Sequence, residues 1–175
     1  MPKLDDTLSP SALTVRLLNA RDTDAYRTLR LEALKSHPEA FASSWELEVE
    51  KPTSWWTERL SISTIFGGWK NSTSLIGTAG FYRQDGAKLR HKGVLWGMYV
   101  HPQARGSGLA TTLLNSAIEH AKSLVEELSL TVTASNTAAR RLYEKMGFEE
   151  YGLERRALKI GTEYYDEVLM SLSLR

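Results

Sequence analysis

The stretch VHPQARGSGLATTLL, residues 100–114, decides the fold. It joins an apolar segment, GVLWGMYV (residues 93–100), to apolar residues spaced as on one face of a helix. Glycines let a backbone approach a ligand closely, and the N–H groups at a helix start attract anions. Arg105 adds a charge suited to a phosphate oxygen. The stretch predicts either a pyrophosphate-binding loop or a plain strand-to-helix turn.

Two common phosphate-binding motifs are excluded at this loop. A Walker loop carries Lys followed by Ser or Thr after its last glycine, whereas Leu109 and Ala110 follow here. A dinucleotide-binding fold requires Gly or Ala where Thr111 stands, and an acidic residue at the end of the next strand. That strand ends in TVTAS, which contains no acid. The loop therefore belongs to another kind of site, or to none.

Outside the loop, strand-like and helix-like segments alternate along the chain. We expect seven strands, at residues 13–20, 63–71, 73–84, 91–100, 128–134, 148–160 and 164–172. We expect helices at residues 22–35, 53–60, 109–125 and 135–146, and a connector of mixed character at residues 39–52. This order predicts an α/β fold with a mixed, mostly antiparallel sheet and helices on both faces.

The composition narrows the class of protein. The chain has 175 residues and a net charge of +1, which predicts no nucleic-acid partner and no attraction to acidic membranes. It has no cysteine, which excludes disulfides and thiolate catalysis, and we expect no metal site. The N-terminus lacks the apolar centre of a signal peptide, and no apolar run approaches the roughly 18 residues of a membrane span. We therefore expect a cytoplasmic protein with a flexible arm at residues 1–12.

A second motif, together with the loop, indicates which kind of site the loop belongs to. RGSGLA, with Arg105, Gly108 and Ala110 at the key spacing, resembles the Arg/Gln-x-x-Gly-x-Gly/Ala signature of the GNAT family of N-acetyltransferases. NTAARRLYEKMGF, residues 136–148, resembles that family's Asn-x-x-Ala-x-x-Leu-Tyr-x-x-x-Gly-Phe pattern. The two motifs stand in order with a helix and a strand between them. The resemblance implies a single N-acetyltransferase domain of GNAT-like fold at residues 13–175.

The resemblance also implies acetyl-CoA as the acetyl donor. The backbone at the end of the fourth strand would pair with the pantetheine arm, through Met98, Tyr99 and Val100. The loop and helix start would hold the pyrophosphate, through Arg105, Gly106, Ser107, Gly108, Leu109, Ala110 and Thr111. Asn136 would contact the donor through its amide, cap the helix that it precedes, or do both.

Gly97 lies inside an apolar strand, where glycine often marks a bulge. In the GNAT family a bulge here opens a slot for the thioester, and the Met98 N–H would then face the thioester oxygen. The alternative is that a glycine simply relieves crowding by a neighbouring Trp. We interpret Gly97 as the bulge.

The catalytic acid is implied at Tyr143, where the family places a phenol beside the departing sulfur; the alternative is a core tyrosine. The general base has no clear candidate, because Trp96 stands where many relatives carry Glu. Glu32 on the first helix borders the acceptor cleft in relatives, although an ordinary exposed glutamate is an equal interpretation. Asp166 is a weaker candidate, and an ordered water is a further route.

The acceptor is predicted to be the primary amine of a small molecule. Trp45 lies in the connector that lines the acceptor site in relatives, where it could stack on the acceptor. The acidic run ELEVE (residues 46–50) is interpreted as a solvated face. Alternatives are an acetyltransferase acting on a protein N-terminus or lysine, and a non-catalytic acetyl-CoA-binding domain. The sequence is also compatible with a homodimer.

Overall fold

The computed structural model describes residues 12–175, so the arm expected at residues 1–12 lies, except for Ala12, outside the described residues. Seven strands form one sheet in the order β1-β2-β3-β4-β5-β7-β6. β4 and β5 run parallel, and the other neighbouring pairs run antiparallel. The predicted mixed sheet is confirmed. Its strands are β1 (Leu13–Leu17), β2 (Thr64–Lys70), β3 (Ser74–Arg83), β4 (Lys92–Val100), β5 (Glu127–Thr133), β6 (Glu149–Ile160) and β7 (Glu163–Ser173).

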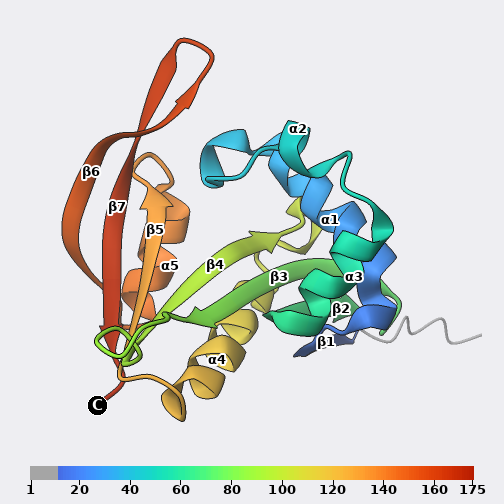
Figure 1. Cartoon of the computed structure of the whole chain (residues 1–175), viewed down its shortest axis with the longest axis horizontal. Helices are drawn as coiled ribbons and strands as arrows, with labels where there is room; N and C mark the ends of the chain where they lie inside the picture. Colours follow the sequence, from blue (N-terminus) through green and yellow to red (C-terminus); the bar gives the residue numbers. More distant parts are fainter. Residues whose placement is uncertain (1–11) are drawn as a thin grey trace, which may run out of the picture.

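Helices pack on both faces of this sheet, as predicted (Figure 1). Four of them lie where the sequence predicts helices. The short helix α2 falls in the connector and was not predicted, because four residues are too few to show helical periodicity. The helices are α1 (Thr23–Ser36), α2 (Trp45–Glu48), α3 (Thr53–Ile62), α4 (Leu109–Lys122) and α5 (Thr137–Lys145).

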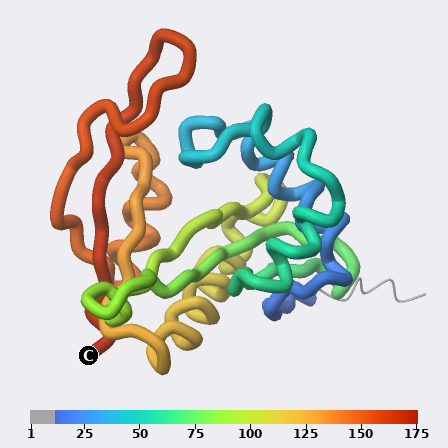
Figure 2. The backbone as a smooth tube through the Cα atoms, viewed as in Figure 1, coloured from blue at the N-terminus to red at the C-terminus, as the bar shows by residue number. Residues whose placement is uncertain are grey.

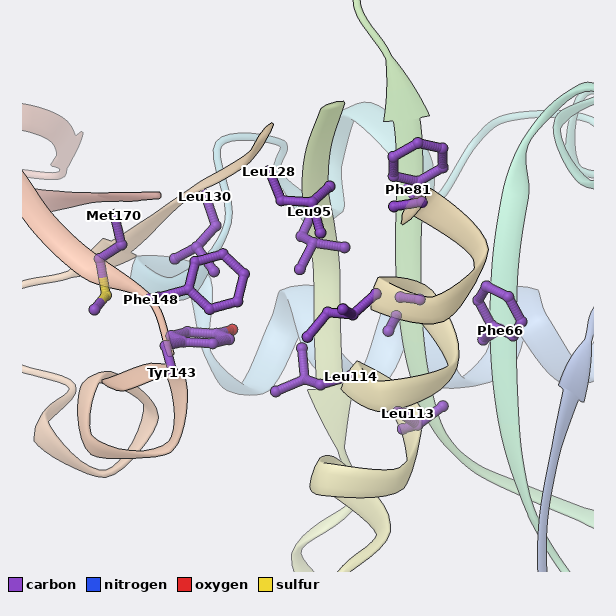
Figure 3. Close-up of a cluster of buried hydrophobic side chains, with 14 of the residues drawn as sticks. Phe66, Phe81, Leu95, Leu113, Leu114, Leu128, Leu130, Tyr143, Phe148 and Met170 are labelled. Carbon is purple, nitrogen blue, oxygen red and sulfur yellow. The ribbon is translucent and has the colours of Figure 1, made fainter. Parts of the chain in front are cut away.

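Each face of the sheet has its own hydrophobic core. On one face, α4 buries Leu113 and Leu114 completely, and α5 adds Tyr143 (Figure 3). On the other, α1 and α3 bury Tyr26 and Trp56 against β2. Both cores are built from helical apolar stripes facing the pleated sheet, which is the usual way that an α/β domain removes apolar surface from water.

The sheet splits between β4 and β5. These strands pair only over three positions, from Lys92 opposite Glu127 to Val94 opposite Ser129, and then diverge (Figure 1). The segment that follows α1 reaches across the open end of this gap, where the Thr133 hydroxyl donates a hydrogen bond to the Glu39 carbonyl at 2.6 Å (Figure 2). The split leaves the β5-facing edge of β4 without a strand partner from Leu95 onward.

A bulge in β4 accompanies the split, as the sequence predicts. Thr78 of β3 lies opposite Tyr99, and Gly80 lies opposite Trp96, so two residues of β4 face one residue of β3. Gly97 takes a φ of +59°, which glycine adopts at little cost. The Thr78 hydroxyl donates to the Gly97 carbonyl at 3.0 Å and fixes the bulge. In the described part of the chain, no helix combines the length and apolar character needed to cross a membrane.

Candidate active site

A cavity of about 600 Å³ opens between the diverging strands. Four segments line it: the bulged half of β4, the loop before α4, the end of β5 with α5, and the turn after α1. These segments come from distant parts of the sequence and meet only because β4 and β5 part. Ligand sites in sheets with parallel strands commonly occupy such a gap beyond the strand ends.

The loop before α4 is shaped for an anion. Gly106 and Gly108 have φ values of +77° and +84°, and no atom lies within 4 Å of a Cβ built on either. Within residues 12–175, neither backbone N–H has an acceptor. Ala110 and Thr111 lie in the first turn of α4, where N–H groups have no intrahelical acceptor. The loop therefore presents unpaired donors at a helix N-terminus, the arrangement that binds phosphates.

Arg105 lies beside this loop and is exposed. Its Nη2 lies 3.2 Å from His37 Nε2, and its Nε lies 3.4 Å from the Val100 carbonyl. Both contacts hold the guanidinium at the mouth of the cavity, and both leave donors free. The predicted loop residues lie together, although Ser107 and Thr111 are not among the cavity-lining residues of the described chain. The Ser107 hydroxyl instead bonds the Ala104 carbonyl within the loop.

The predicted backbone segment of β4 lies on the same cavity. Met98, Tyr99 and Val100 line it, next to Gly97. The side chain of Tyr99 leaves the cavity for the opposite face, where its hydroxyl donates to Glu32 Oε1 at 2.9 Å. Burial and this hydrogen bond raise the pKa of Tyr99 to about 12. The residues predicted from the second motif, Asn136 and Tyr143, lie across the cavity from this strand.

Tyr143 is buried, with 7% of its surface exposed, and lines the cavity. Its ring meets Phe148 edge to face at 5.9 Å, and its hydroxyl points toward the α4 side of the core (Figure 3). Burial alone raises the pKa of Tyr143 to about 12. No hydrogen-bond partner for the hydroxyl exists among residues 12–175, yet the oxygen is not one of the fully enclosed unpaired atoms. It is a free donor with access to the cavity.

Asn136 has the helix-capping role that the sequence predicts. Its Oδ1 accepts a hydrogen bond from the Ala139 N–H at 3.2 Å at the start of α5. Asn136 also lines the cavity, so its amide nitrogen remains available to a ligand. The two interpretations offered for this residue are therefore compatible.

The structure places the acceptor-site candidates elsewhere. Glu32 lies in a separate groove beside His101. Trp45 packs against the buried cluster that includes Tyr99, with Lys35 Nζ 5.3 Å from its ring centre. Neither lines the cavity. Asp166 accepts the Arg156 N–H at 2.8 Å and holds an irregularity between β6 and β7. These three side chains therefore lie outside the cavity, whose wall on this side is the turn after α1, and their assignment to the acceptor side stays a prediction.

Sequence reasoning missed two carboxylates. Glu39, in the turn after α1, is the acidic residue that lines the cavity in the described chain. Glu48 is buried and not part of a solvated face, with Arg30 Nη2 at 2.9 Å from its Oε1. The sequence of residues 46–50 alternates acidic and apolar residues and does not distinguish Glu48 from the other two acids. In the structure, Glu48 is the one acid of this run that is buried, at the end of the short helix α2. Within residues 12–175, no group of acidic or histidine side chains is arranged to hold a metal.

Known proteins match both the sequence and the fold. Mycothiol acetyltransferase of Thermobispora bispora is 29% identical over 140 residues, which are 77% of this chain and 45% of that protein. L-2,4-diaminobutyric acid acetyltransferase of Vibrio cholerae is 32% identical over 77 residues, 43% of each chain. The matches thus span less than half the length of these curated relatives.

A solved structure agrees over the whole fold. The putative acetyltransferase yncA from Salmonella typhimurium, solved with its cofactor acetyl-CoA, superposes with a TM-score of 0.80 at 22% identity. The superposition covers 94% of this chain and 95% of that one. The model of the acetyltransferase (GNAT) family matches residues 26–148, from the first helix to the end of the second motif. The chain belongs to the acetyltransferase (GNAT) family.

Proposed function

We propose that the protein transfers the acetyl group of acetyl-CoA to the primary amine of a small molecule. One observation carries the proposal: the anion-binding loop, the unpaired edge of β4 and the free hydroxyl of Tyr143 open into the same cavity. In acetyl-CoA, the diphosphate requires the anion-binding loop, the amide-bearing arm requires the free strand edge, and the thioester sulfur requires the hydroxyl. The solved relative named above contains acetyl-CoA, and a curated relative is named for an amine-bearing amino acid.

The loop residues fit the donor at its diphosphate end. A side chain at Gly106 or Gly108 would project into open space where the diphosphate must lie, and their positive φ values exclude most other residues. Backbone N–H groups from Gly106 to Thr111 would bind its oxygens, and Arg105 would add a charge-assisted contact. The free edge of β4 at Met98 and Val100 would pair with the amide groups of the arm, as an added strand does.

The reaction requires a neutral amine, whose lone pair attacks the carbonyl carbon of the thioester. Negative charge develops on the carbonyl oxygen, and the Met98 N–H, freed by the bulge, would stabilise it. The bond from carbon to sulfur then breaks, and the amide product and CoA thiolate separate. The proton lost by the amine and the proton gained by the sulfur balance, so no other reactant is consumed.

Tyr143 would donate to the departing sulfur. A phenol with a pKa of about 12 keeps its proton at neutral pH, so the donor form is always present. An ordinary thiol has a pKa near 8.5, but burial beside an apolar core raises that value as well. The low polarity that keeps Tyr143 protonated therefore also strengthens its hydrogen bond to the thiolate.

Glu39 replaces Glu32 as our candidate for the base. It lines the cavity, and its Oε1 lies 3.7 Å from His37 Nδ1, so the turn after α1 offers an acceptor for the amine proton. The strand position where relatives carry Glu is occupied by Trp96, whose indole fills the space left by Gly80. β4 therefore offers no carboxylate at this position, and we assign the role to Glu39 on the cavity wall.

A panel assay tests this function. Purified protein is mixed with acetyl-CoA and a panel of small amines, basic peptides and N-terminal peptides, and release of the CoA thiol is followed together with product mass. We expect acetylation of small amines above peptides. Faster acetylation of peptides would support a protein acetyltransferase instead. Tight acetyl-CoA binding without transfer to any acceptor would identify a non-catalytic binding domain.

A further inference from the structure

Two arginines share one buried carboxylate behind the cavity wall. Arg30 donates to Glu48 through Nε at 3.1 Å and Nη2 at 2.9 Å, and Arg59 Nη1 lies 3.4 Å from the same carboxylate. The side chains of Arg30, Glu48 and Arg59 are 8%, 5% and 17% exposed. Burial acts to raise the pKa of Glu48, but the two guanidinium groups hold it below its ordinary value, so the carboxylate is ionised. The cluster keeps a net charge of +1.

Aromatic rings pack against the two guanidinium groups of this cluster. The Arg59 guanidinium lies 4.9 Å from the ring centre of Trp96 and 5.0 Å from that of Trp55. The Arg30 guanidinium lies 5.1 Å from the ring of Phe41. Phe41 and Trp96 also line the cavity. The cationic cluster is therefore separated from the cavity by single side chains, and its charge is poorly screened there.

Gly97 lines the cavity and is also a neighbour of Arg30. A Cβ built on Gly97 has one neighbour within 4 Å, Arg30 Nη1 at 3.8 Å. Nε and Nη2 of Arg30 are committed to Glu48, whereas Nη1 has no acceptor among residues 12–175. The fully enclosed unpaired side-chain atoms in this part of the chain are two indole nitrogens, so Nη1 keeps access to solvent. Arg30 Nη1 is thus a free donor of a charged group, and it faces the space that a side chain at Gly97 would occupy.

We propose that the acceptor carries a carboxylate next to its amine, and that Arg30 Nη1 binds this carboxylate beside Gly97. The inference rests on the proposed function and names its substrate class. A carboxylate satisfies the unused guanidinium donors and neutralises the excess charge of the cluster. Because Gly97 adjoins Met98, a carboxylate held there brings the neighbouring amine to the thioester carbonyl.

The same charge discriminates between acceptors. It attracts acceptors that carry a carboxylate. It also repels polyamines and other acceptors that carry extra positive charge. The cluster therefore selects amino acids over simple amines.

Matched acceptor trios test the inference. L-leucine, L-phenylalanine and L-glutamine are each compared with their carboxamide and their decarboxylated amine, by kcat/KM from CoA release. We expect the amino acid of at least one trio to exceed both partners by about 10- to 100-fold, the effect of one hydrogen bond to a charged group. Equal rates within the trios, faster reaction of the decarboxylated amines, or reaction of none of the trios would overturn the inference.

Two variants assign the effect to Arg30. Arg30→Lys keeps the charge and the pairing with Glu48 but loses the forked donor, so the preference for the acid should fall about tenfold or more while acetyl-CoA affinity is retained. Arg59→Lys changes the same ion pair without facing Gly97, and should keep the preference. Loss of preference in Arg59→Lys alone would contradict the assignment. Absence of acetyl-CoA binding in the parent protein would instead refute the proposed function itself.

Discussion

The Tyr99 hydroxyl donates a hydrogen bond to Glu32 Oε1 at 2.9 Å, joining β4 to α1 on the side of the strand away from the cavity. Glu32 also lies 3.5 Å from His101 Nε2. The carboxylate is thus engaged in a structural contact outside the site that we assign to the acetyl donor. In this position Glu32 supports the strand that carries the bulge.

Replacing Glu32 with Gln should leave turnover unchanged. The substitution keeps an acceptor for Tyr99 and removes the negative charge, so the main effect is a loss of roughly 0.5–1.5 kcal/mol in the free energy of unfolding. Steady-state rates across pH 6–9 and a denaturant titration measure both quantities. A large fall in turnover with a displaced pH profile would restore Glu32 as the base.

Replacing Glu39 with Gln should lower turnover by on the order of 10²-fold or more, because a base positioned on the cavity wall is removed. The slope of the rate against pH on the acidic side should change with it. Glu46→Gln is the matched control, since Glu46 is an exposed acid on the same connector. If Glu39→Gln keeps the parent's rate and pH profile, the amine loses its proton to water.

Replacing Gly108 with Val should abolish tight binding of acetyl-CoA. The new side chain would project from a backbone with φ of +84° into the space assigned to the diphosphate. Gly86→Val is the control, because Gly86 also has a positive φ of +95° and open surroundings, but lies in a turn outside the cavity. Both variants should lose stability through backbone strain. Calorimetry should show weaker acetyl-CoA binding in Gly108→Val, and undiminished affinity there would refute the loop assignment.

Much of this fold is visible in local sequence patterns. The loop before α4 combines glycines, an arginine and a helical stripe, and each feature is set by neighbouring residues. Gly97 indicates the bulge because a glycine inside a strand often marks one, and the bulge here requires a positive φ. The capping role of Asn136 is equally local. These features could be predicted because short-range backbone geometry determines them.

Which acidic side chains line the cavity could not be predicted in this way. Whether Glu32, Glu39 or Glu48 faces the cavity depends on how the connector crosses the gap between β4 and β5, which is a matter of tertiary packing. Glu48 stands in a run that looks solvated, and its partner Arg30 lies 18 positions away on another helix. A buried ion pair of this kind leaves no periodic signal in the sequence.

Alkaline pH should destabilise the protein through Tyr143. Its pKa is about 12 in the folded protein and about 10 in the unfolded chain. The stabilisation by the buried neutral phenol is therefore complete below pH 10 and is lost as the pH rises from 10 to about 12. The Tyr143→Phe variant has no phenol to ionise at this position. Between pH 10 and 12, its free energy of unfolding should therefore fall by about 2–3 kcal/mol less than that of the parent protein. Tyr82→Phe, which alters an exposed tyrosine, should follow the parent.

Tyr143→Phe also tests the proposed acid. The substitution keeps the ring, so the edge-to-face contact with Phe148 should survive, and the hydroxyl has no partner to lose among residues 12–175. Stability at neutral pH and acetyl-CoA affinity should therefore match those of the parent. Turnover should fall by on the order of 10² to 10⁴, the usual contribution of general acid catalysis.

The leaving group provides the decisive comparison for Tyr143. If its hydroxyl assists departure of the sulfur, the variant should lose most of its rate with acetyl-CoA and much less with an acetyl thioester of a more acidic thiol, whose thiolate needs no proton. Presteady-state measurement of CoA release separates this step from product release. A variant as fast as the parent with both donors would mean that Tyr143 serves only the core, in contact with Phe148 and α4.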